Sequence, residues 1–122
     1  MDSIEEHQKL RKSYLDKVRS LEPFDAAFQI IIYNKNHREI HGPFAQEELS
    51  MYEAFPSLCS DKRVDSMRRA EGLFNASTEM YSFINNAPNK ESIMNRLKAV
   101  HPGFSESIYS SIIGRVQYMA VK

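Results

Sequence analysis

The sequence is poor in the residues that cross-link or rigidify small folds. Its 122 residues include one cysteine, Cys59, no tryptophan, four glycines and five prolines. A lone cysteine excludes a disulfide within the chain and is typical of a reducing compartment, so we expect a cytoplasmic protein. The scarcity of glycine and proline argues against long disordered segments. A chain of this length can bury a core without cross-links, and we expect one domain over residues 1–122.

Long apolar runs are also missing. No stretch approaches the roughly 18 apolar residues that cross a bilayer, and the start of the chain, Met1 to Glu6, is acidic rather than apolar. We therefore expect neither a signal peptide nor an association with membranes.

Signatures of catalysis are absent too. The chain contains no glycine-rich nucleotide or phosphate loop and no Gly-x-Ser-x-Gly elbow, which are the patterns that mark phosphate sites and activated serines. We predict no catalytic residue and no cofactor, and enzymatic activity is not favoured. A small enzyme or ligand-binding protein with an unrecognised site is kept as an alternative.

One pair of histidines, His37 and His41, has the four-residue spacing of a possible metal site. On a helix the two side chains would share a face and could ligate zinc. Gly42-Pro43 follows at once and would end such a helix, and the other histidines and Cys59 are scattered along the chain. We interpret the pair as loop histidines and predict no metal.

The spacing of apolar residues predicts helices along most of the chain. Ser3 and Glu6 form a capping box that opens the first helix, and Leu10, Tyr14, Val18 and Leu21 would form its buried face. Further helices are predicted from Phe44 to Phe55, from Asp61 to Asn85, from Asn89, and from Ser105. The breaks fall near Leu21-Glu22, His41-Gly42, Pro56 to Ser60, Asn85 to Pro88 and His101 to Phe104. The predicted fold is all-α, a compact bundle of five to six helices.

The last two helices form a hairpin around the turn His101-Pro102-Gly103-Phe104. The first carries an apolar stripe of Ile93, Leu97 and Val100, and the second one of Ile108, Ile112, Val116 and Met119. Phe104 and Tyr109 are spaced for a hydrophobic staple at the start of the final helix. Gly72, inside the long helix before them, suggests a close helix crossing or a kink.

Residues 28 to 41 admit two interpretations, because short apolar runs do not distinguish a strand from a buried helix. Pro23 and Asp25 are typical of a helix start, and we favour a helix. The alternative is a small hairpin over about 28–41, which would make the fold α+β.

The residues Tyr33, Gly42-Pro43-Phe44 and Glu48-Leu49 resemble, over about 20 residues, the GYF adaptor family. That resemblance implies binding of proline-rich peptides. The chain has no tryptophan, and the Gly-Tyr-Phe segment that names the family is missing downstream, so we do not expect it to be a member.

Charge is balanced overall but not along the chain. Residues 1–61 hold 7 Lys/Arg against 11 Asp/Glu, and residues 62–122 hold 9 against 5. The two halves would face each other, within the fold or across a symmetric dimer, or the basic half would present a face to an acidic partner. A nucleic-acid-binding regulator is the alternative use of that basic half. Ser105-Glu106-Ser107 is a poor start for a recognition helix, so nucleic acid is not the expected partner.

The function that this sequence favours is protein–protein interaction or regulation. The final helix has a second apolar line that includes Tyr109, Ile113 and, further round, Tyr118, and a helix that is apolar around most of its girth is central or shared with a partner. We therefore expect a homodimer. The predicted interaction surface consists of Tyr109, Ile113, Tyr118, Arg68 and Arg69.

Overall fold

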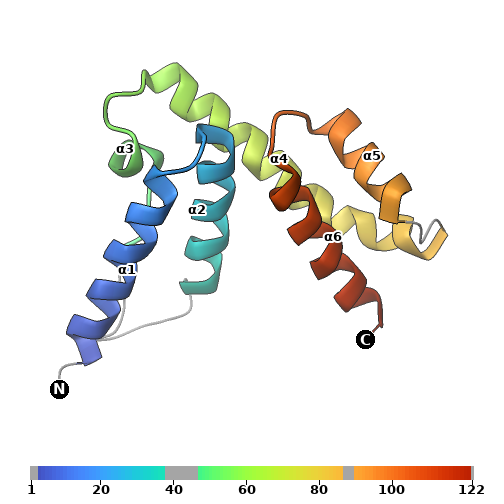
Figure 1. Ribbon diagram of the computed structural model, residues 1–122, viewed down its shortest axis with the longest axis horizontal. Coiled ribbons are helices and arrows are strands. Elements are labelled where there is room, and N and C mark those ends of the chain that lie inside the picture. Colours follow the sequence, from blue (N-terminus) through green and yellow to red (C-terminus); the bar gives the residue numbers. More distant parts are fainter. Residues whose placement is uncertain (1–2, 38–46, 87–89, 122) are drawn as a thin grey trace. The chain divides into compact units, whose positions relative to one another are not determined.

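The computed structural model describes residues 3–37, 47–86 and 90–121, with the side chains of 4–37, 47–76 and 91–114. Within these ranges the chain forms six α-helices and no strand (Figure 1). They are α1 (Ser3–Arg19), α2 (Pro23–His37), α3 (Met51–Ala54), α4 (Ser60–Asn86), α5 (Lys90–Val100) and α6 (Glu106–Val121). The prediction of a mainly α fold that ends in a helical hairpin is confirmed.

Helix α2 decides between the two interpretations of residues 28–33 in favour of the helix. Pro23 is its first residue, where the missing N–H of proline would have no partner in a helix anyway. The N–H of Ala26 donates to the carbonyl of Glu22 at 2.8 Å, which closes the first turn. The remainder of the alternative hairpin, residues 38–41, lies outside the described residues.

The chain divides into two compact units, Met1–Met67 and Arg68–Lys122. The first contains α1, α2, α3 and the beginning of α4. The second contains the rest of α4 with α5 and α6. The expectation of one domain over residues 1–122 stays a prediction.

In the first unit, α1, α2 and α3 pack against one another in pairs, and α2 is the most deeply buried. The phenol of Tyr14 on α1 donates to Gln29 of α2, with the backbone carbonyl and Oε1 both at 3.0 Å. The buried residues are Asp25, Ala26, Ala27, Phe28, Ile30, Ile31 and Tyr33 from α2, Leu15 and Val18 from α1, and Leu49, Met51 and Ala54 from the region of α3.

The helix expected from Phe44 to Phe55 is much shorter than predicted. Only Met51–Ala54 is helical, residues 47–50 are not, and residues 44–46 lie outside the described ranges. Two distant side chains bind the backbone of this segment. Arg11 donates to the carbonyls of Glu47 and Glu48, and the amide of Asn34 pairs with both the N–H and the carbonyl of Leu49 at 2.8 and 2.9 Å. These bonds replace the helical ones.

In the second unit, α5 and α6 pack as the predicted hairpin. Gly103 in the turn has φ of 103°, a left-handed conformation that favours glycine. The Tyr109 phenol donates to the carbonyl of His101 at 2.6 Å and accepts the N–H of Phe104 at 3.3 Å. The rings of Phe104 and Tyr109 meet edge to face, 6.1 Å apart, as the predicted staple requires.

Four large apolar side chains lie on the surface, and two of them, Leu10 and Val100, were predicted to be buried. The four are Leu10 of α1, Tyr52 of α3, Val64 of α4 and Val100 of α5, which are 67%, 66%, 62% and 62% exposed. On α1, the face that is buried is rotated around the helix axis relative to the predicted stripe. Leu15, which lies about 140° from Leu10 around the helix axis, is buried together with Val18, whereas Leu10 is exposed.

Candidate interaction surface

Arg68 and Arg69, two residues of the predicted interaction surface, are exposed on α4. One turn further along the helix, Gly72 receives the ring of His101. A Cβ built on Gly72 would lie 3.5 Å from Cε1 and 3.6 Å from Nδ1 of that ring. Because Cα–Cβ bonds in a helix tilt toward its N-terminus, the ring lies over the turn that carries the two arginines. The close approach expected at Gly72 is therefore made by the hairpin turn.

His101 is held in place through its backbone. Its N–H donates to the carbonyl of Leu97 at 2.8 Å, and its carbonyl accepts the phenol of Tyr109 at 2.6 Å. Tyr109 is itself only 2% exposed. The turn is thus anchored to α6 from inside, and the imidazole beside Gly72 is half-buried.

Next to His101 in the chain, the end of α5 presents an exposed pair. Ile93 and Leu97 are each 1% exposed and face the core, whereas Arg96 and Val100 face solvent. Arg96 and Val100 are four residues apart, so they are neighbours on the helix surface. We call the set of Arg68, Arg69, Arg96, Val100 and His101 the basic corner.

The unit that carries the basic corner has a net positive charge. The second unit, residues 68–122, holds 7 Lys/Arg against 4 Asp/Glu, and the first, residues 1–67, holds 9 against 12. Lys98 of the second unit is engaged with Glu106, and this hydrogen bond lowers the pKa of the Glu106 carboxyl. The basic corner thus combines three guanidiniums with an exposed aliphatic side chain. Guanidiniums match carboxylate and phosphate groups in a two-pronged geometry that an ammonium lacks.

In the first unit, the exposed ring of Tyr52 packs against an arginine of the same unit. The guanidinium of Arg63 lies 4.9 Å from the centre of the Tyr52 ring, and Arg63 Nη1 donates to the carbonyls of Phe55, Pro56 and Leu58. Tyr52 is therefore exposed but held in position. These contacts account for Arg63 as a structural residue of the connection between α3 and α4.

The remaining predicted surface residues are placed differently. Tyr109 and Ile113 are buried, at 2% and 1% exposed, and belong to the core of the second unit. The side chain of Tyr118 lies outside the described ones. A shared role for α6 between two copies stays a prediction. Among the predicted surface residues whose side chains are described, Arg68 and Arg69 are exposed.

His37 stacks on Tyr33, with ring centres 4.0 Å apart, and its Nδ1 lies 2.8 Å from the carbonyl of Tyr33. His41 lies outside the described residues, so the pair as a whole is not placed. Among the residues that are described, no three His, Cys, Asp or Glu side chains are grouped to hold a metal ion. No helix in those ranges is long and apolar enough to cross a membrane.

Three members of the basic corner were not predicted from the sequence. Arg96 was not singled out, Val100 was assigned to a buried apolar stripe, and His101 was assigned to the turn. The signal that could have found them is Gly72, because a glycine inside a helix often marks close approach by another segment. No protein-family model, curated protein or solved structure matches this chain.

Proposed function

We propose that this protein is an interaction domain that binds an acidic protein partner through the basic corner. The observation that carries the proposal is the exposure of Val100 beside Arg96, together with two further arginines on the helix under His101. Protein interfaces combine an apolar centre with arginine and a polar rim. Opposite charge on the partner would speed association and fix its orientation.

Nucleic acid is the second class of partner that the three arginines of the basic corner could bind. Its affinity comes mainly from neutralised phosphates and therefore grows with the number of cations. The second unit has a charge of only +3, and α6, which would be the recognition helix of a helix-turn-helix, begins with an exposed carboxylate, Glu106. Both features favour a protein partner.

The test uses the full chain and a pair of charge-reversed variants. Arg68→Glu with Arg69→Glu changes the basic corner, and Lys12→Glu with Lys62→Glu makes the same change of charge at exposed positions of the first unit. Proteins captured by the wild type from a native extract are purified and their affinity for each variant is measured. The proposal expects loss of at least about tenfold in affinity for the corner variant alone.

Equal loss in both variants, or in neither, would overturn the proposal. A mobility-shift titration with duplex and single-stranded oligonucleotides measures nucleic-acid binding of the wild type and of the same variants. Tight binding that weakens steeply with salt and disappears in the corner variant would assign the basic corner to nucleic acid instead.

A further inference from the structure

We propose that residues 47–50, which we call the switch segment, are a conformational switch. They exchange their bonds to Arg11 and Asn34 for about one added turn at the start of α3, which then extends backward from Met51. Every residue involved belongs to the first unit, so the switch is independent of the basic corner and of the function proposed for it.

The switch segment combines a helix-forming sequence with a non-helical conformation. Glu47, Glu48 and Leu49 are good helix formers, and the apolar spacing predicts a helix that runs through them into α3. In the structure α3 begins only at Met51, and Ser50 before it is extended, with φ of −135° and ψ of 157°. A conflict between local sequence and structure is typical of functional or strained sites. The switch segment is therefore where a second state is expected.

The bonds to the switch segment occupy three consecutive backbone carbonyls. Arg11 donates through Nε and Nη2 to the carbonyls of Glu47 and Glu48, at 2.8 and 3.0 Å. Asn34 donates through Nδ2 to the carbonyl of Leu49 at 2.9 Å, and its Oδ1 accepts the N–H of the same residue at 2.8 Å. Side chains from α1 and α2 thus act as donors where a helix would supply backbone N–H groups.

A longer α3 would use the same three carbonyls. In an α-helix each carbonyl accepts the N–H four residues further along, so these acceptors match the N–H groups of Met51, Tyr52 and Glu53. In the structure, Ala54 donates its N–H to the carbonyl of Ser50, and Glu53 donates to the Ser50 hydroxyl. The two states therefore satisfy the same carbonyls with different donors, and neither leaves them unpaired.

Two features keep the short form of α3 dominant. The hydroxyl of Ser50 accepts the N–H of Glu53 at 3.1 Å as an N-cap. Leu49 is only 3% exposed, and its burial opposes the exchange. In a longer helix, Leu49 would lie about 160° around the axis from the buried Met51 and about 60° from Tyr52.

The exchange therefore changes the surface of the first unit. Tyr52 is 66% exposed in the short form of α3, in which Leu49 is buried. In the longer form the two side chains lie three residues apart on one helix, so they are neighbours on its exposed face. The position of the equilibrium thus controls whether an apolar pair, Leu49 with Tyr52, is presented to solvent.

Two substitutions at Ser50 test the switch and are matched to each other. Ser50 is exposed, and both Ser50→Ala and Ser50→Gly remove the capping hydroxyl. Alanine is a poor N-cap and the best residue inside a helix, whereas glycine is tolerated as an N-cap and destabilises a helix interior. The ratio of longer to short α3 should therefore be at least about tenfold higher in Ser50→Ala than in Ser50→Gly.

Both substitutions are made in the wild-type chain and in an Asn34→Ala chain, which lacks both bonds to Leu49 and should shift the ratio further toward the longer form. Cα chemical shifts measure the helical fraction of the switch segment, and relaxation dispersion detects the longer form where it is a minor state. Contacts between the Leu49 methyl groups and the Tyr52 ring identify the longer helix. Tyr14→Phe is the control for Asn34→Ala, because it removes a bond from α1 to Gln29 of α2 and leaves the switch segment untouched.

Equal helical fractions in Ser50→Ala and Ser50→Gly would overturn the inference. A switch segment that loses its order in Asn34→Ala without becoming helical would do so too, as would an equal gain of helix in Tyr14→Phe. Circular dichroism checks that each variant stays folded. If Asn34→Ala unfolds the first unit, the pair of substitutions at the exposed Ser50 in the wild-type chain decides the question alone.

Discussion

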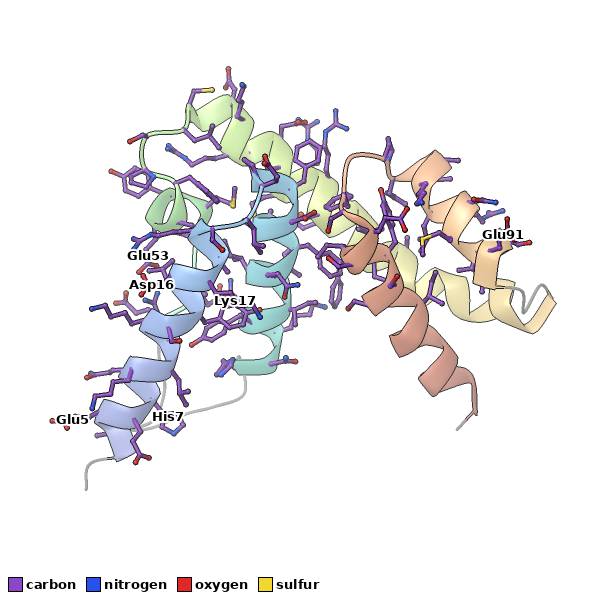
Figure 2. All side chains as sticks on the ribbon, in the orientation of Figure 1. Glu5, His7, Asp16, Lys17, Glu53 and Glu91 are labelled. Carbon is purple, nitrogen blue, oxygen red and sulfur yellow. The ribbon has the colours of Figure 1, made fainter. Side chains whose placement is uncertain are left out.

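One arginine side chain explains why the segment before α3 is not a helix. Arg11 on α1 forms a two-pronged ion pair with Glu53 on α3, at 2.8 and 2.9 Å, and also binds the carbonyls of Glu47 and Glu48. Figure 2 shows Glu53 lying toward α1. The pair is more protected than a surface ion pair, because the Arg11 side chain is only 15% exposed and that of Glu53 is 35% exposed.

Replacing Arg11 by lysine tests the value of the planar guanidinium. Lysine keeps the charge but cannot reach four oxygens with one ammonium, so Arg11→Lys should lower the free energy of unfolding by about 1–2 kcal/mol. Arg19→Lys is the control, since Arg19 makes one bond to the Glu53 carbonyl at 3.0 Å and is more exposed. Its cost should stay below about 0.5 kcal/mol. Urea denaturation of both variants measures the difference, and equal costs would contradict the assigned role of Arg11.

The same pair makes stability depend on pH. The hydrogen bond from Arg11 holds the pKa of the Glu53 carboxyl below its ordinary value of 4.5 in the folded chain. The unfolded chain therefore binds more protons than the folded one near that pH. The stabilisation is fully present above the unfolded pKa and is lost as pH falls through the folded pKa.

Glu53→Gln isolates this contribution from that of the other carboxylates. At pH 7 the variant should be less stable than wild type, and the gap should close as pH falls below about 4.5. Urea titrations of both proteins at a series of pH values give the gap directly. A gap that does not change with pH would show that Glu53 contributes through packing and not through its charge.

At the scale of elements, the three turns that the sequence located well are those fixed by local chemistry. Pro23, Pro56 and Gly103 each dictate the backbone at their own position, so their breaks could be predicted without any tertiary information. Which edge of an apolar stripe is buried depends on neighbouring helices, and for that reason Leu10 and Val100 were misplaced. The bonds from Arg11 and Asn34 to the segment before α3 join residues that are 15 to 42 positions apart, and no periodicity encodes them.

The basic corner was predictable only in part, for the same reason. Arg68 and Arg69 follow a charge trend that is visible in the sequence. The place of His101 on Gly72 follows from how the hairpin packs, and sequence suggested only that something approaches Gly72. Tyr109 was correctly assigned to the hydrophobic staple, but it was also included in the predicted interaction surface. The final helix has two apolar lines, and the sequence does not show which of them is buried within the same chain.

Two glycines of the hairpin should respond to alanine in opposite ways. Gly103 has φ of 103°, so Gly103→Ala forces a side chain into a strained backbone and should cost about 1–2 kcal/mol. Gly114 lies inside α6 with nothing within 4 Å of an added Cβ. Gly114→Ala should stabilise the chain by up to about 1 kcal/mol. Thermal unfolding measures both, and a loss on Gly114→Ala would mean that α6 is covered there by something the single chain lacks.

At the scale of the whole molecule, the prediction of a single domain can be tested through α4. This helix runs from Ser60 to Asn86, and the boundary between the two units at Met67 and Arg68 lies inside it, with no cap or break. We expect the units to unfold together, because unfolding either one strips part of α4 of its packing.

Amide hydrogen exchange measures whether the two units unfold together. Arg11→Ala weakens the first unit and Gly103→Ala weakens the second, and each should lower amide protection in both. Protection lost only in the unit that carries the change would mean two independently unfolding units, and the single-domain prediction would then be wrong.

The division at Met67 also has a consequence for synthesis. Every bond described for Arg11, Tyr14 and Asn34 joins residues that precede position 54, so these contacts can form while the rest of the chain is still being translated. Because α5 and α6 are neighbours in the chain, their pairing closes only a short loop and should be fast. Late steps on the ribosome would therefore involve the hairpin, and Gly103→Ala should delay them more than any change in α1.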